Sequence, residues 1–280
     1  MENMKRSEER KLEDRHYTPV VIKRNDETLR HPDDILDAAI FEGMEQFERT
    51  KFSLFLSAIA AGLILGFVGL SVGFAQGLVP EGSSPYFERL IKALFYPLGF
   101  VVCILSRTQL FTEHTARAVY PFLEGKVKLP NILSIWAIVL IGNIVGTLLC
   151  SLLIHVANPV IALQAQYQEV FHHLIQNTSL EVFASAILAG WLMAQCGWLI
   201  LGTTSTGSQM ISIYIGTFLI GIGGLHHCIA GSAEVWLGLL SNGFHDIGPA
   251  FVFLVSAIIG NLIGGSLFVA CLNYGHIRQA

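Results

Sequence analysis

The stretch Ser57-Ala-Ile-Ala-Ala-Gly62 decides the fold, because Ser185-Ala-Ile-Leu-Ala-Gly190 repeats it with a single change. A second pair of words follows in the same order. Gly142-Asn-Ile-Val-Gly146 is matched by Gly260-Asn-Leu-Ile-Gly264. Apolar helices share short words by chance, but two ordered matches indicate that the second half of the chain repeats the first. We expect Asn143 and Asn261 to form hydrogen bonds between helices at the close approach that the glycines allow.

The composition is typical of a membrane protein. The chain has 280 residues, of which 52% are hydrophobic and 14% charged, whereas soluble domains carry about 25% charged residues. Its uncharged apolar runs exceed the roughly 18 residues that indicate a membrane span, which disfavours a large soluble helical core. These runs are Phe52 to Gly77, Asn131 to Ile154, Val182 to Thr203 and Pro249 to Tyr274.

Two further apolar segments are interrupted. The second segment, about 87–125, contains Ser106-Arg-Thr-Gln109, and the fifth, about 209–240, contains several glycines followed by His226-His227. Each is predicted to form two half-helices, whose non-helical joint must be buried in protein or line a wet cavity. The repeat sets Leu110-Phe111-Thr112 against Leu225-His226-His227.

The sequence therefore predicts an all-α membrane protein with six transmembrane helices. Three spans per repeat is an odd number, so the second copy enters the membrane from the opposite side. Inverted repeats with broken second and fifth helices place the functional site near the midplane. The N-termini of the half-helices carry partial positive charge and favour an anion there.

The pattern of charged and apolar residues divides the chain into four parts. Residues 1–31 are predicted to be a disordered tail, 32–50 an amphipathic helix, 51–275 the six-span domain and 276–280 a short C-terminal end. The helix could lie on the membrane, against a neighbouring subunit or over the chain's own core. Ten of the seventeen Lys and Arg precede residue 52, and none lies in 156–179. Both termini are therefore predicted to be cytoplasmic.

The residues around the interruptions resemble the formate/nitrite transporter family. The resemblance rests on Pro97-Leu-Gly-Phe-Val-Val-Cys-Ile-Leu105, Leu110-Phe111-Thr112 and Gly224-Leu-His-His227-Cys-Ile-Ala230, and spans about 35–275. It implies a bacterial inner-membrane protein, a homopentamer of aquaporin-like protomers, each with its own pore for small monovalent anions such as formate or nitrite. It also implies that Thr112 and His227 lie in the pore between apolar constrictions, with Leu110 at one of them.

The chain departs from the family pattern at several places. Arg107-Thr108-Gln109 stands where the family has Gly-Ser/Ala-Asp/Glu, and glycines at Gly190 and Gly231 replace asparagines. A lysine expected before the fourth segment is missing, although His172 and His173 lie near that place. With these departures, the chain resembles a divergent branch of the family.

His227 and Thr112 are the main candidates for a solute pathway. An ionisable residue inside a membrane is a functional candidate by default, although a buried histidine can simply bond a backbone carbonyl. His227 could give a proton to a weak-acid anion in transit, or only hydrogen-bond it. Thr112 could cap its half-helix, face a solute, or do both. Leu110, Phe111 and Leu225 are weaker candidates for the pore wall, because apolar wall and core look alike in sequence.

Arg107 needs a partner if it is buried in a span. Glu113 and Glu234 are available, so a structural ion pair is one interpretation. The other is that Arg107 attracts anions in place of the missing lysine.

The leading hypothesis is a channel or transporter for small monovalent anions, with a proton carried through His227. A channel for a small neutral solute such as water, ammonia or an undissociated acid is one alternative, and a non-conducting membrane sensor or scaffold is another. The sequence contains no nucleophile–base pair typical of an enzyme. Adjacent histidines on a helix point about 100° apart, so no metal site is predicted. We expect no cofactor and no nucleic-acid partner.

Overall fold

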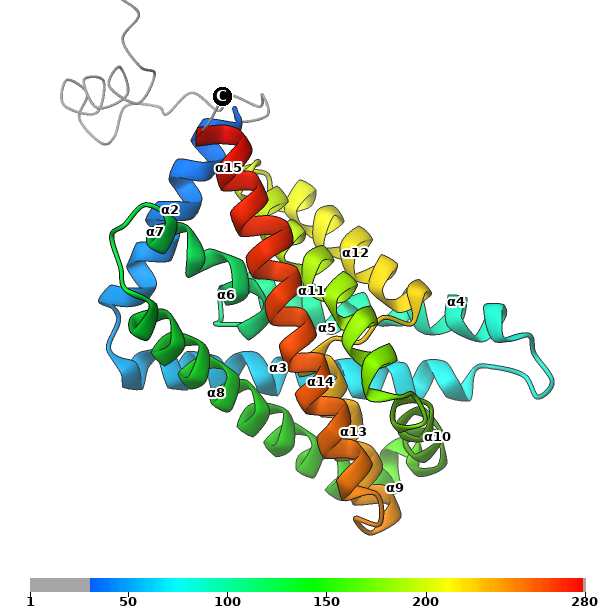
Figure 1. Ribbon diagram of the computed structural model, residues 1–280. Helices are drawn as coiled ribbons and strands as arrows, with labels where there is room; N and C mark the ends of the chain where they lie inside the picture. The colour runs from blue at the N-terminus through cyan, green and yellow to red at the C-terminus, as the bar shows by residue number, and fades with distance from the viewer. Residues whose placement is uncertain (1–30, 279–280) are drawn as a thin grey trace, which may run out of the picture.

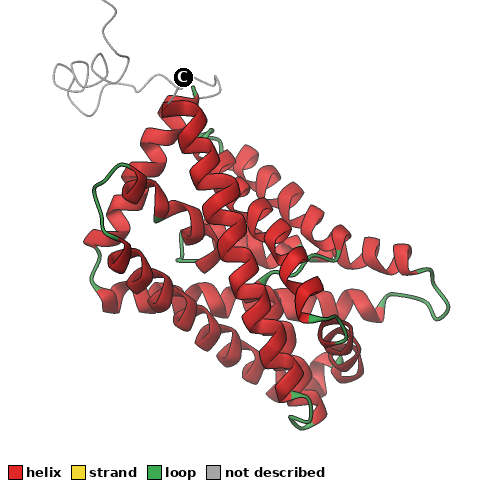
Figure 2. Cartoon of the chain, viewed as in Figure 1, coloured by secondary structure: helices red, strands yellow, loops and turns green. Residues whose placement is uncertain are grey.

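The computed structural model describes residues 31–278, and every regular element in that range is helical (Figure 2). The predicted disordered tail lies, apart from its last residue, outside the described residues. In chain order the elements are α2 (Pro32–Glu48), α3 (Lys51–Gly77), α4 (Pro85–Phe95), α5 (Pro97–Leu105), α6 (Phe111–Arg117), α7 (Val119–Leu123), α8 (Leu129–Val156), α9 (Asn158–Ile161), α10 (Gln164–Ile175), α11 (Ser179–Leu201), α12 (Thr206–Gly223), α13 (Cys228–Asn242), α14 (Ile247–Gly265), the π-helical turn η1 (Ser266–Cys271) and α15 (Leu272–Arg278).

Apolar helices dominate the described part of the chain. Five helical stretches within it are long and apolar enough to cross a membrane: Lys51–Gly77, Leu129–Val156, Ser179–Leu201, Thr206–Gly223 and Ile247–Arg278. Their starts carry local signals, because the Thr50 side chain accepts a hydrogen bond from the Ser53 N–H, and Thr178 forms a capping box with Glu181. The four uninterrupted runs predicted from sequence are thus helices.

Two helix pairs built from the repeated words form the frame of the molecule. Helix α3 packs on α8, and α11 packs on α14. A side chain at Gly146 would meet the Ile59 carbonyl, and one at Gly264 would meet the Ile187 carbonyl. The backbones therefore approach as closely as glycine permits, at corresponding places in both halves.

Helix α2 covers the chain's own core. Its buried face includes Leu36, Ala39 and Ile40, which belong to one apolar cluster with residues of α7, α11 and η1. Asp37 pairs with Arg278 of α15 at 3.1 Å, so the first and last described helices meet at one end of the molecule (Figure 1). One face of this helix therefore packs on the chain's own core, which is one of the three positions that the sequence left open.

Both interrupted segments are broken where the sequence predicts. The chain leaves helix geometry between α5 and α6, at 106–110, and between α12 and α13, at 224–227. The second segment also divides at Tyr96–Pro97 and at Ala118, so it consists of four short helices. The two breaks lie against each other inside the bundle, where they position the candidate site.

Candidate pore site between two broken helices

Asn143 of α8 holds the first break. Its Oδ1 accepts the N–H of Phe111 at 2.8 Å, and its Nδ2 donates to the carbonyls of Gln109 at 2.9 Å and Ala58 at 2.8 Å. The asparagine is fully buried. One side chain thus satisfies backbone groups on both sides of the break and ties them to α3, as buried backbone groups require.

Asn261 of α14 holds the second break in the same way. Its Oδ1 accepts the N–H of Cys228 at 2.8 Å, and its Nδ2 donates to the carbonyls of His226 at 3.0 Å and Ala186 at 2.7 Å. The predicted interhelical role of both asparagines is confirmed. Their hold on the breaks is an additional role that the sequence did not reveal.

These hydrogen bonds correct the alignment of the two breaks. They set Gln109 against His226, and therefore Leu110 against His227. Leu110 and His227 are the residues before α6 and α13, with nearly equal backbone angles (φ −100°, ψ 126° and φ −104°, ψ 122°). The predicted match of Thr112 with His227 is wrong by two residues. The sequences at the two breaks share too few residues to set their alignment. The hydrogen bonds of the two asparagines to the backbone set it instead.

Thr112 and His227 nevertheless meet across the two halves. His227 Nε2 lies 2.8 Å from Thr112 Oγ1, and both residues are buried. The other ring nitrogen, Nδ1, accepts the N–H of Ala230 at 3.2 Å. A neutral imidazole with an acceptor at Nδ1 carries its proton at Nε2, so His227 donates to the Thr112 oxygen. The Thr112 hydroxyl hydrogen is then available to a solute.

The capping roles differ from those predicted. Thr112 lies inside α6, which has no side-chain cap, whereas His227 caps α13 through its Nδ1. A threonine two residues into the helix cannot serve as the N-cap, because that place belongs to Leu110. The histidine therefore combines a structural bond at one nitrogen with a polar contact at the other.

Apolar side chains surround this polar pair. Phe100 of α5 meets the His227 ring edge-to-face, with 4.9 Å between ring centroids. Leu110 and Phe111 are buried in the same region of the core, and Leu225 is half-buried against it. The structure thus brings four of the predicted site residues close to the break, with Leu225 at its edge.

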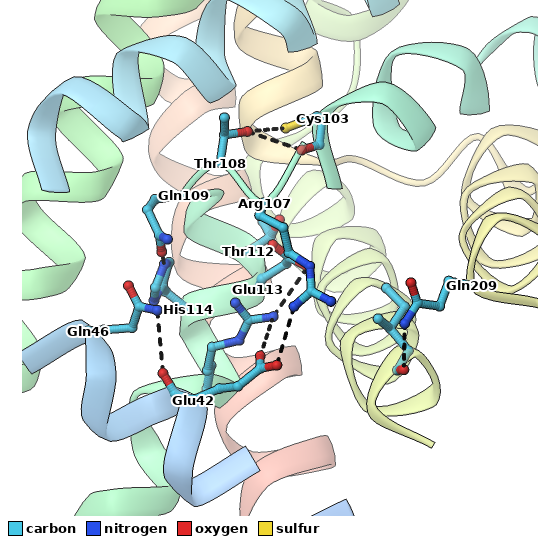
Figure 3. Close-up of polar contacts among 12 residues, drawn as sticks. Glu42, Gln46, Cys103, Arg107, Thr108, Gln109, Thr112, Glu113, His114 and Gln209 are labelled. Carbon is cyan, nitrogen blue, oxygen red and sulfur yellow. Dashed lines mark hydrogen bonds and ion pairs between the residues drawn. The ribbon is translucent and has the colours of Figure 1, made fainter. Parts of the chain in front are cut away.

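Arg107 lies outside this group, at a polar cavity beside α2. Its side chain is 70% exposed and pairs with Glu42 at 3.4 Å, as Figure 3 shows. The expectation of a buried arginine paired with Glu113 or Glu234 is wrong, because the break turns Arg107 outward with a positive φ of 56°. The α2 cavity, as we call it, has a volume of ≈ 480 Å³; it is lined by Glu42, Glu45, Gln46, Glu48, Arg49, Ile104, Leu105, Arg107, Thr108, Gln109, Glu113, Arg117, Ile200 and Gln209.

Residues 33–275 match the family model described as formate/nitrite transporter. The chain belongs to the formate/nitrite transporter family. Inner membrane protein YfdC of Escherichia coli (strain K12) is 31% identical over 253 residues, covering 85% of this chain and 76% of that protein. Formate channel FocA of the same strain is 24% identical over 264 residues, covering 84% of this chain and 92% of that protein.

Solved structures of the formate/nitrite transporter fold superpose on the chain. A structure described as an FNT family ion channel has a TM-score of 0.76 at 18% identity, covering 88% of this chain and 99% of that one. A pentameric formate channel with formate bound has a TM-score of 0.69 at 19% identity, covering 82% and 98%. The fold of this family member is therefore that of a membrane channel.

Some residues around the site of this family member were not found from the sequence. Phe100 lies within a quoted motif, but nothing marked it as a neighbour of His227. Glu42 lies 65 residues from Arg107 and on a different helix. Surface-helix acids carry no pattern that could have linked Glu42 to the break.

Proposed function

We propose that the chain is a channel or transporter for small monovalent anions of the formate and nitrite class. The observation that carries the proposal is the 2.8 Å contact between Thr112 and His227 at the starts of α6 and α13. Family membership supports the class of solute. The names of FocA and of the formate-bound pentamer point to formate as the first anion to test.

The site suits an anion for two physical reasons. Helices α6 and α13 begin at the two breaks, and helix starts carry partial positive charge. The Thr112 hydroxyl hydrogen can be donated to an anion, since the threonine oxygen already accepts from His227. Phe100, Leu110 and Phe111 provide apolar surroundings that disfavour hydrated ions.

The wider arrangement is part of the same proposal. Six spans, namely α3, α4–α7, α8, α11, α12–α13 and α14–α15, would form two inverted repeats. The α2 side would face the cytoplasm of a bacterial cell, in the inner membrane, with five protomers forming a homopentamer. The glycine and asparagine pairs shared by the halves support the repeat, and the solved pentamer supports the assembly.

Formate uptake by purified protein in liposomes tests the proposal. We expect uptake in the unaltered protein and a loss of about 10- to 100-fold in Thr112→Val, because a hydrogen bond to a charged group contributes about 1.5–3 kcal/mol. His227→Leu should lose as much. Thr217→Val is the matched control, since Thr217 is a buried threonine that donates to Ile213 of its own helix.

The outcome also separates the alternative functions. Osmotic swelling without formate uptake or anion current would indicate a neutral-solute channel. Binding of a partner protein without flux of any tested solute would indicate a sensor or scaffold. Unchanged formate uptake in both Thr112→Val and His227→Leu would contradict the proposed site.

A further inference from the structure

Glu113 is a buried carboxylate beside the candidate pore. It follows Thr112 in the first turn of α6, and its side chain is 4% exposed. Its Oε1 accepts no hydrogen bond from the described part of the chain. Its ion pair with Arg117 is long, at 3.7 Å. A buried carboxylate oxygen without a donor is costly, and a proton or a water molecule would remove that cost.

Arg117 does not belong to Glu113 alone. The same Nη2 atom lies 3.6 Å from Oε2 of Glu42 on α2. Glu42 in turn pairs with Arg107, whose guanidinium is mostly in solvent and therefore contributes little. Other ion pairs of the molecule are tighter, such as Lys92–Glu88 at 2.6 Å. Glu113 and Glu42 thus share the partly buried Arg117, and both ion pairs are longer than the Lys92–Glu88 pair.

Charged groups from several elements lie around Glu113. Acids outnumber bases among the residues that line the α2 cavity, with Glu42, Glu45, Glu48 and Glu113 against Arg49, Arg107 and Arg117. This balance favours a cation over an anion at Glu113. Figure 3 shows Glu113 beside Thr112, in the same region as the Arg107–Glu42 pair. The titratable and charged groups that act on or face it are Glu42 and Arg49 of α2, Arg107 of the break, His114 and Arg117 of α6, Cys103 of α5 and Cys196 of α11.

We propose that Glu113 is a proton-binding site that links the α2 cavity to the passage of the anion. A proton from cavity water binds Oε1 and forms an O–H bond, the carboxylate becomes neutral, and Arg117 pairs with Glu42 alone. Release to water on the same side reverses the step. Glu113 follows Thr112 in the first turn of α6, so the charge of its carboxylate lies within one helical turn of an anion at Thr112. This inference rests on the proposed function.

Formate uptake as a function of pH tests the proposal. In the unaltered protein we expect uptake to rise about tenfold as the pH on the α2 side is lowered stepwise from neutral, because the neutral acid no longer repels the anion. Glu113→Gln should keep uptake high and nearly constant over the same range. Asp37→Asn is the matched control, because Asp37 lies on α2 but pairs with Arg278 away from the cavity.

Two further variants should shift the pH midpoint of formate uptake in opposite directions. Glu42→Gln leaves Arg117 wholly to Glu113 and should shift the pH midpoint of uptake to lower pH. Arg117→Gln removes the shared cation and should shift the midpoint to higher pH. These shifts keep the proposal testable if Glu113→Gln does not fold, since a merely structural ion pair predicts no ordered shifts.

The results that would contradict this inference can be told apart from those that would contradict the proposed function. A Glu113→Gln protein with the pH profile of the unaltered protein would overturn the inference and leave the proposed function standing, as would uptake that does not respond to pH. Absence of formate uptake by the unaltered protein at every pH would overturn the proposed function and this inference with it.

Discussion

The two breaks share one backbone design and carry different chemistry. Each is held by a buried asparagine, and each passes through one residue with a left-handed backbone. That residue is Arg107 (φ 56°) in the first break and Gly224 (φ 60°) in the second, at matching places. Three residues later stand Leu110 and His227. The backbone arrangement is therefore repeated in the two breaks, whereas the side chains at matching positions differ.

The difference assigns a role to each half. The second break supplies the titratable ring that meets Thr112. Helix α6, which follows the first break, supplies the threonine, and Arg107 in that break contacts α2. The α2 cavity accordingly lies beside the first break, with Arg107, Thr108 and Gln109 in its lining.

The largest test of the shared frame removes the asparagines. Asn143→Ala and Asn261→Ala each leave one buried N–H and one buried carbonyl of the break without the asparagine partner, and each removes a further hydrogen bond to a carbonyl of the facing helix. Each should therefore lower the free energy of unfolding by about 3 kcal/mol. The measurement is the unfolding midpoint in detergent, with the exposed Asn131→Ala as control. Clearly unequal losses in the two halves would contradict the equivalence of the breaks.

A smaller effect is expected at the crossing points of the helix pairs. Gly146→Ala and Gly264→Ala each place a methyl group against a carbonyl of the facing helix, which should cost about 1–3 kcal/mol. Gly197→Ala is the control, because a side chain there would meet nothing nearby. The same detergent unfolding assay applies, and two stable variants would show that the helices do not cross this closely.

The smallest expected effect is on stability at the two left-handed residues, and it has opposite signs in the two breaks. Gly224→Ala should destabilise by about 1–2 kcal/mol, because a left-handed backbone is unfavourable for residues with a Cβ. Arg107→Gly should recover a similar amount at the backbone. Comparing Arg107→Gly with Arg107→Ala, which equally lacks the Glu42 pair, isolates that gain. Equal stability of these two variants would rule out strain at Arg107.

Much of the frame could be predicted from the sequence. The repeated words around Gly62 and Gly190 mark real helix crossings, and the polar interruptions mark real breaks. These features are readable because hydropathy and close-packing glycines act locally along a helix. The register between the breaks was not readable, since the chain shows no matching word there.

The sequence by itself determined that the chain is a helical membrane protein with two broken segments and with Thr112 and His227 near them. Only the tertiary structure decided that His227 corresponds to Leu110, that Thr112 accepts from its ring, and that Arg107 faces Glu42. The reason is distance along the chain. Thr112 and His227 are 115 residues apart, and their contact depends on two asparagine-held breaks that no local pattern encodes.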